Sequence, residues 1–133
     1  SFACAVLFYL DFSAYRDEGV GFTGLRYARA DYGPVPDQYD LVMAALVDGA
    51  TLAYREQGDG RVVVARRGAD LSAFSPREVA RLDAVAAFAN GFASTAELSA
   101  YSHEERAWLE TPSGEVIDYA FACDLRMPAA PLP

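Results

Sequence analysis

Two prolines separated by a single residue, Pro34 and Pro36, limit the fold of this chain more than any other feature of its sequence. Each proline fixes its own φ angle, lacks a backbone N–H, and pushes the residue before it away from helical geometry. Residues 25–30 alternate apolar and polar side chains, which predicts a short strand with one buried face. Because the prolines are expected to end that strand, residues 32–36 should form a rigid, extended elbow.

A helix is predicted directly after the elbow. Asp37 stands at an N-cap position ahead of apolar residues at helical spacing, and Gly49 follows as a stop, so residues 37–48 are expected to be helical. A strand, a stiff bend and a helix in this order would hold Tyr27, Tyr32 and Tyr39 near one another.

Two further patterns come from the first half of the chain. Residues 2–17 are apolar on nearly every side, which is typical of a core helix, and Gly19 is placed to end it. Residues 51–57 and 61–67 are β-rich runs separated by Gly-Asp-Gly, which predicts a hairpin with a three-residue connection. With the strand at residue 25, they would form a small three-stranded antiparallel sheet.

Three Ser-x-x-Glu patterns predict helices that begin at Ser75, Ser94 and Ser102, since each serine can cap a helix whose third residue is glutamate. The third pattern makes His103 the first residue of its helix. The chain is therefore expected to be an α+β protein, mainly helical, with a single domain over residues 1–125. Residues 126–133 are proline-rich and are expected to be a disordered tail or linker.

The acidic composition excludes some functions. Nineteen acidic and 11 basic residues give a net charge of −8, so nucleic-acid binding by this chain alone is not expected. No apolar stretch reaches the ~20 residues of a membrane span, and no signal peptide is recognisable, which predicts a cytoplasmic protein. Cys4 and Cys123 are expected to be buried thiols, and with the single histidine they are too few for a metal site. No cofactor is predicted.

The sequence also gives no pattern for catalysis. Ser102, His103 and Glu104 are neighbours in sequence, and adjacent residues of a helix do not face one another, so they cannot form a nucleophilic relay. The carboxylates recur in no acid–base pair. We therefore expect a protein that is not an enzyme.

An alternative function is a winged-helix-like DNA-binding transcriptional regulator. The order helix, strand, helix, hairpin would make residues 37–48 the recognition helix and place Arg61, Arg66 and Arg67 on the wing. This helix, however, contains several aspartates and no arginine, and it would be repelled by phosphates.

Five motifs in order resemble one family. They are Phe-Tyr-Leu-Asp-Phe at 8–12, Gly19, Thr-Gly-Leu-Arg-Tyr at 23–27, Tyr-Gly-Pro-Val-Pro at 32–36, and the segment from Leu98 to Trp108. Together they resemble the Panacea domain of SocA-like antitoxins over residues 5–122. An ordered set of this kind is more specific than a single motif.

The resemblance implies a function. Such domains are antitoxins of bacterial toxin–antitoxin systems that neutralise a cognate toxin by direct binding, and a SocA-like member acts as an adapter that delivers its toxin to a protease. The expected partners are therefore a toxin and, for an adapter, a protease. A net charge of −8 would complement a basic toxin.

Two groups of residues are expected to matter. All are carried over from this resemblance except Tyr39, which the elbow is expected to hold near Tyr27 and Tyr32. The expected partner-binding residues are Tyr27, Tyr32, Gly33, Pro34, Val35, Pro36 and Tyr39. The expected structural motif of the late helix consists of Ser102, His103, Glu104 and Trp108. The elbow has two interpretations: it fixes a turn in the core, or it presents rigid tyrosines and prolines to a partner at little entropic cost. The sequence is compatible with both.

Overall fold

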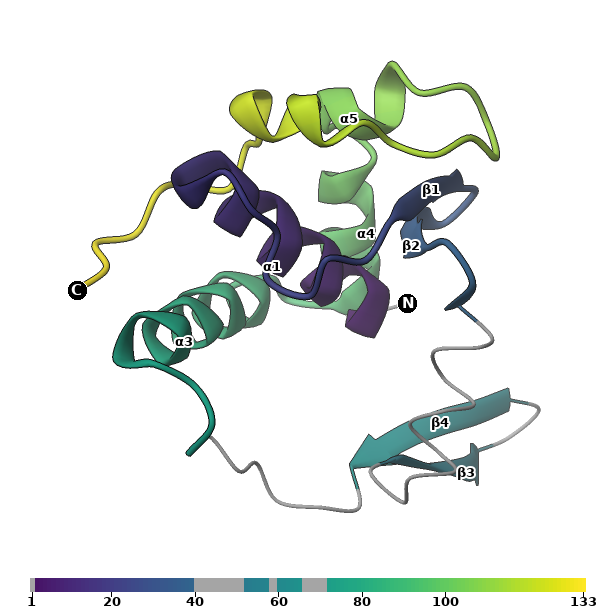
Figure 1. The fold of residues 1–133 in the computed structure, drawn as a ribbon. Helices are drawn as coiled ribbons and strands as arrows, with labels where there is room; N and C mark the ends of the chain where they lie inside the picture. The colour runs from purple at the N-terminus through teal and green to yellow at the C-terminus, as the bar shows by residue number, and fades with distance from the viewer. Residues whose placement is uncertain (1, 40–51, 58–59, 66–71) are drawn as a thin grey trace. The chain divides into compact units, whose positions relative to one another are not determined.

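The computed structural model describes residues 2–39, 52–57, 60–65 and 72–133. The chain divides into two compact units, Ser1–Asp37 with Phe74–Pro133, and Gln38–Ala73. The first unit contains α1 (Phe2–Glu18), β1 (Tyr27–Ala30), β2 (Gly33–Pro36), α3 (Pro76–Asn90), α4 (Thr95–Ser102), α5 (Arg106–Leu109) and the 3₁₀ helix η1 (Tyr119–Asp124) (Figure 1). The second unit contains β3 (Leu52–Gln57) and β4 (Gly60–Ala65).

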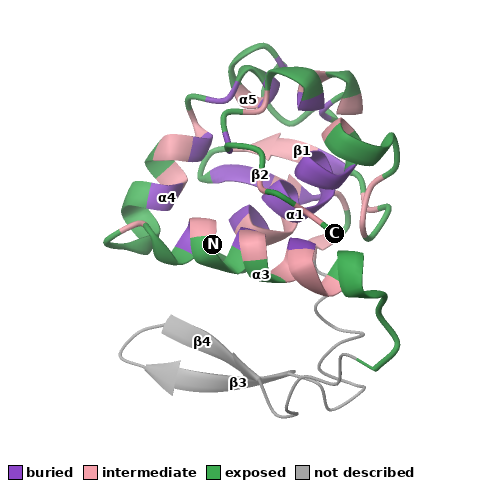
Figure 2. Cartoon of the chain, turned by 90° about the vertical axis from the view of Figure 1, so that its left-hand side faces the viewer, coloured by how far each residue is buried: buried purple, intermediate pink, exposed green. Residues whose placement is uncertain are grey.

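Helix α1 is the centre of the first unit. It contacts β2, α3, α4 and η1, and Figure 1 shows it between α3 and the β1–β2 pair. Figure 2 shows most of α1 in the buried colour. Phe8, Tyr9 and Phe12 are all at most 1% exposed, so the prediction of a core helix at the start of the chain is confirmed. A helix that is apolar on every face is stable only where other elements cover it.

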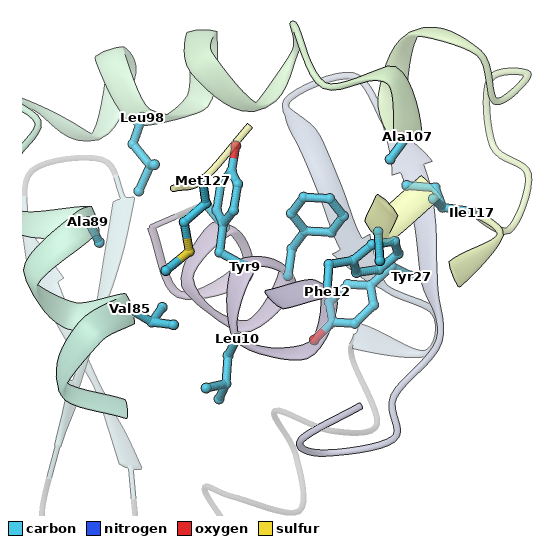
Figure 3. Packing of buried hydrophobic residues seen from close by; sticks show 13 residues of the cluster. Tyr9, Leu10, Phe12, Tyr27, Val85, Ala89, Leu98, Ala107, Ile117 and Met127 are labelled. Atoms are coloured by element: carbon cyan, nitrogen blue, oxygen red, sulfur yellow. The ribbon is translucent and has the colours of Figure 1, made fainter. Parts of the chain in front are cut away.

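The core around α1 also contains residues from the second half of the chain. Val85 and Ala89 come from α3, Leu98 from α4, and Ile117 and Met127 from the segments after α5 (Figure 3). Met127, the second residue of the segment predicted to be a disordered tail, is 4% exposed and packs in the core. A methionine followed by proline can pack in this way because its flexible side chain fills irregular gaps.

Two of the three predicted helix starts are confirmed. The Ser75 hydroxyl accepts the N–H of Glu78 at 3.1 Å, and the Glu78 carboxylate accepts the N–H of Ser75 at 2.9 Å, which is a complete capping box. At α4 the Ser94 hydroxyl accepts the N–H of Glu97 at 3.2 Å. The third predicted start, at Ser102, is wrong, because Ser102 is the last residue of α4.

The elbow is itself a strand, so the prediction that the prolines end strand structure there is wrong. β2 pairs antiparallel with β1, and Val35 lies opposite Ala28. Beyond the strand ends, the N–H of Asp37 donates to the carbonyl of Arg26 at 2.7 Å.

The pairing explains why β2 tolerates two prolines. In an antiparallel pair only every second residue exchanges hydrogen bonds with the residue opposite. Asp37 donates across the pair, so Val35 occupies the next such position and Pro34 and Pro36 fall between these positions. A proline there removes no donor that the pair needs.

The other side of β1 is taken by the chain after α5. The N–H of Arg29 donates to the carbonyl of Glu115 at 3.0 Å, and the N–H of Ile117 donates to the carbonyl of Tyr27 at 2.8 Å. β1 therefore lies between β2 and residues 115–117. The α+β class is supported, but the predicted three-stranded sheet is not confirmed, because β3 and β4 form a two-stranded sheet of their own.

The second unit contains the predicted hairpin. β3 and β4 pair antiparallel from Leu52 opposite Ala65 to Gln57 opposite Gly60. Gly60 belongs to β4, so two residues separate the strands instead of the predicted three. The predicted helix at 37–48 falls mostly on residues 40–51, which lie outside the described residues, and so does the recognition helix of the DNA-binding alternative.

Two remaining sequence expectations concern the thiols and membrane spans. Cys4 is buried as expected, but Cys123, on η1, is exposed, so that part of the prediction is wrong. In the part of the chain that the structure describes, no helix has the length and apolarity needed to span a bilayer.

Candidate partner-binding surface

Tyr27 anchors β1 inside the first unit. Its side chain is fully buried and lies against Phe12, with the ring centroids 5.9 Å apart (Figure 3). Its hydroxyl donates to the carboxylate of Asp11 at 2.5 Å. Burial, and then the charge of Asp11, raises the pKa of Tyr27 above its usual range. Because none of Tyr27 reaches the surface, its predicted role as a partner-binding residue is not supported.

Asp11 also fixes the loop that leads into β1. It is fully buried on α1, and it accepts the backbone N–H groups of Thr23 and Gly24 at 2.5 and 3.3 Å. A buried carboxylate is stable only when donors surround it in this way. Two of the five motifs, at residues 8–12 and 23–27, therefore meet at one hydrogen-bonded group.

Tyr32 is the exposed residue of the elbow. Its side chain is 82% exposed, whereas Gly33, Pro34 and Pro36 are buried and Val35 is half-buried. The two interpretations of the elbow thus apply to different residues, since the prolines belong to the core and Tyr32 belongs to the surface.

Tyr39 belongs to the second unit and is half-buried. The expected proximity of Tyr39 to the other two tyrosines stays a prediction.

Helix α4 fixes the backbone of the turn that carries Tyr32. The Ser99 hydroxyl donates to the carbonyl of Tyr32 at 2.9 Å. Gly33 has a φ of +126°, and a Cβ at this position would lie 3.1 Å from the hydroxyl oxygen of Ser102. Only glycine combines this φ with so close an approach. Tyr32 is therefore presented from a constrained backbone.

Trp108 holds the end of β1 on the other side of the turn. Its indole N–H donates to the carbonyl of Ala30 at 2.9 Å. The guanidinium carbon of Arg29 lies 3.8 Å from the centroid of the Trp108 ring, a cation–π distance. The His103 ring lies 4.5 Å from the same indole. This cluster links β1, the end of α4 and α5.

The sequence predicted that a helix begins at Ser102, but no helix begins there. α4 continues through Ser102, because the N–H of His103 still donates to the carbonyl of Ser99 at 3.1 Å. The buried Ser102 hydroxyl bonds the same carbonyl at 2.7 Å. Glu105, which should have completed the capping box, instead accepts the N–H of Arg126 at 2.8 Å. His103 is the C-cap of α4, not the first residue of a helix.

Ser102, His103 and Glu104 do not assemble a nucleophilic site either. The Ser102 hydroxyl is used within α4, and the Nε2 atom of His103 is buried with no hydrogen-bond partner among the described residues. Glu104 is exposed and pairs with Arg126 at 3.1 Å. Within residues 2–39, 52–57, 60–65 and 72–133 we also find no group of three His, Cys, Asp or Glu residues that could hold a metal ion.

A groove of about 460 Å³ lies beside the Tyr32 turn. Its lining consists of Tyr32, Thr95, Ala96, Ser99, Ala100 and His103. The lining residues of α4 recur every three or four positions and so share one face of the helix. Sequence reasoning did not identify these residues. The small residues at 95–96 and 99–100 could have indicated a helix face with little side-chain bulk. Two alanines make part of this lining apolar, and the hydroxyl groups of Thr95 and Ser99 and the imidazole of His103 are among its polar groups.

Comparison with known proteins identifies the family. A family model described as antitoxin SocA-like, Panacea domain, matches residues 6–109. The chain belongs to this family. The resemblance stated from the sequence is thereby confirmed, and all five motifs lie inside the match. Searches of curated proteins and of solved structures found no match.

The description of the Panacea domain family names an antitoxin, which supports an antitoxin role in general. In this Panacea domain the elbow and the late motif, far apart in sequence, come together around Tyr32, Gly33, Ser102 and Trp108.

Proposed function

We propose that this Panacea domain is an antitoxin that neutralises a cognate toxin by binding it directly, and that Tyr32 and the groove beside α4 form part of the contact. The observation that carries the proposal is the match to the SocA-like antitoxin family over residues 6–109. The geometry around Tyr32 supports this choice of surface.

Tyr32 has the properties of an anchor residue. Tyrosine is enriched among the residues that dominate binding energy at protein interfaces. The hydrogen bond from Ser99 and the close approach of Gly33 to Ser102 already order the backbone around it. A partner would therefore lose little binding free energy in ordering this turn.

Charge supports a basic partner. The chain carries a net charge of −8, which would attract a positively charged toxin and accelerate the encounter at low salt. Binding that depends on this attraction should weaken as salt screens it.

Neutralisation by binding has a stoichiometric signature. An antitoxin that occludes a toxin is needed in at least equal amounts, whereas an enzyme that inactivates a toxin acts at far lower amounts. Titration of a purified toxin with this protein should therefore show protection that saturates near one antitoxin per toxin.

The experiment coexpresses this protein with the product of the gene beside its own. The wild type should restore growth and copurify with that product. Tyr32→Asp should lose both effects, whereas Val20→Asp should keep them, because Val20 is also exposed, at 61%, but lies in the loop after α1. Absence of rescue and of a complex with the wild type contradicts the proposal.

Delivery of the toxin to a protease is the second route to neutralisation that this proposal allows. In a host without its ATP-dependent proteases, direct occlusion predicts unchanged rescue. Adapter function predicts lost rescue together with accumulated toxin. A mobility shift of duplex DNA by the purified chain at low salt would favour the DNA-binding alternative instead.

A further inference from the structure

We propose that the toxin segment bound by this surface carries an apolar side chain next to arginine or lysine, and that it lies across α4 with Ala100 beneath it. This inference rests on the proposed antitoxin function and specifies the chemistry of the partner. It follows from a second hollow that adjoins the groove beside Tyr32.

The second hollow shares one residue with the first. It has a volume of about 280 Å³, and its lining consists of Phe92, Glu97, Ala100, Tyr101 and Glu104. Ala100 lines both hollows and is exposed. Since each helical residue turns by about 100°, Ala100 lies between the Thr95–Ser99 side and the Glu97–Tyr101 side of α4.

The exposed part of α4 is therefore one continuous surface. The buried residues of the helix, Leu98 and Ser102, occupy the opposite side and pack into the unit. Ala100 is common to both linings, and its side chain is a single methyl group. A single element of a partner can cover both because this shared side chain is so small.

The two hollows differ in chemistry. Two alanines, two hydroxyl groups, Tyr32 and His103 surround the first, and none of them carries a formal negative charge, so it suits an apolar side chain. Two carboxylates, Glu97 and Glu104, line the second. Glu104 is 70% exposed, and its ion pair with Arg126 at 3.1 Å is solvent-accessible and therefore weak. An incoming arginine or lysine can join or replace that pair.

The same charges disfavour other occupants. A second copy of this chain would bring two carboxylates and a further net charge of −8 against the same surface. A nucleic acid would bring phosphates toward Glu97 and Glu104. The occupant that the two hollows and the overall charge favour is a protein segment with an apolar side chain for the first hollow and a basic one for the second.

The test compares two variants with matched controls. Ala100→Trp places a large side chain where the two hollows meet, and Glu97→Gln removes a charge beside it while keeping an acceptor for the N–H of Ala93. The controls are Ala87→Trp and Asp83→Asn, which make corresponding changes at exposed positions of α3. Each protein is titrated by calorimetry against the product of the adjacent gene, at low and at high salt.

We expect Ala100→Trp to weaken binding by about 30-fold or more, as expected when a central contact is blocked. Glu97→Gln should weaken binding about threefold at low salt and reduce its salt dependence. Both controls should bind within about twofold of the wild type, as expected of substitutions outside an interface.

The outcomes separate this inference from the antitoxin function. If the wild type neither rescues nor binds the adjacent gene's product, the proposed function fails and this inference fails with it. If the wild type binds and both α4 variants bind like their controls, the function stands and this inference is overturned. The inference is likewise overturned if the free wild type is a dimer that Ala100→Trp converts to a monomer, because a second copy then occupies the surface.

Discussion

Trp108 donates its indole N–H to the backbone carbonyl of Ala30 at 2.9 Å, although the two residues lie 78 positions apart. Ala30 is the last residue of β1, directly before the turn that carries Tyr32. The orientation of that turn is therefore fixed by the late motif as well as by its own sequence. This relationship explains why both motifs contribute to a single surface.

Replacing Trp108 with phenylalanine should loosen this link. Trp108→Phe keeps an aromatic ring but leaves the Ala30 carbonyl without its donor, so the free energy of unfolding should fall by about 1–2 kcal/mol. Leu109→Ala is the control, because Leu109 is 56% exposed on the same helix and should change stability by less than about 1 kcal/mol. Urea denaturation measures both. Equal losses for the two variants would contradict a specific role of the indole N–H.

Gly33 should not tolerate a side chain. Gly33→Ala combines an unfavourable φ of +126° with a Cβ 3.1 Å from the Ser102 hydroxyl oxygen. The free energy of unfolding should fall by about 2–4 kcal/mol. Gly114→Ala is the reference for a positive φ without a close contact, because Gly114 has a φ of +80° with nothing within 4 Å of its Cβ position. Its cost should be only about 1–2 kcal/mol. Thermal unfolding that gives both variants the same stability would show that the contact with Ser102 is unimportant.

The two tyrosines of the elbow region should separate stability from binding. Tyr27→Phe removes a buried hydrogen bond to Asp11 and should cost about 2 kcal/mol of stability. Tyr32→Ala removes an exposed side chain and should change stability by less than about 0.5 kcal/mol, yet it should abolish toxin binding. Circular dichroism during unfolding and calorimetric titration with the toxin give the two readouts. If Tyr32→Ala bound like the wild type, Tyr32 would not be an anchor.

Glu105 should make stability depend on pH. It is 1% exposed, and this burial raises its pKa from 4.5 to about 7, although the Arg126 N–H and charge oppose the rise. Between those two pH values the folded chain keeps the proton that the unfolded chain releases, so stability falls as the pH rises to about 7 and then levels off. The loss should be of the order of 3 kcal/mol.

Glu105→Gln is the matched variant for this prediction. It cannot ionise, but it keeps an acceptor for the N–H of Arg126. Its free energy of unfolding should therefore not show this fall with pH, and it should exceed that of the wild type above pH 7. Urea denaturation at several pH values gives the difference between the two proteins. A difference that does not change with pH would mean that Glu105 stays ionised throughout.

Much of the fold followed from local sequence signals. The apolar residues of α1, the capping serines Ser75 and Ser94, and the hairpin in the second unit all depend on neighbours within a few positions. The errors arose where distant segments decide the outcome. β2 is a strand despite two prolines because its register with β1 places them between the hydrogen-bonding positions.

The candidate site was only partly predictable for the same reason. The motifs at 32–36 and 98–108 were recognised, but nothing local showed that Tyr27 would be buried against Asp11 while Tyr32 would be exposed. Ser102 matched a capping box, yet the Glu105 carboxylate is bound by Arg126, which is 21 positions away. The groove also needs the turn and α4 together, so no single stretch contains it.

Amide hydrogen exchange of the protein with and without its bound toxin tests the central claim most directly. The account predicts slower exchange in the complex at residues 31–33 and 95–104, with no change along the exposed side of α3. A complex in which those two segments exchange at the same rate as in the free protein, while protection appears only elsewhere, would contradict it.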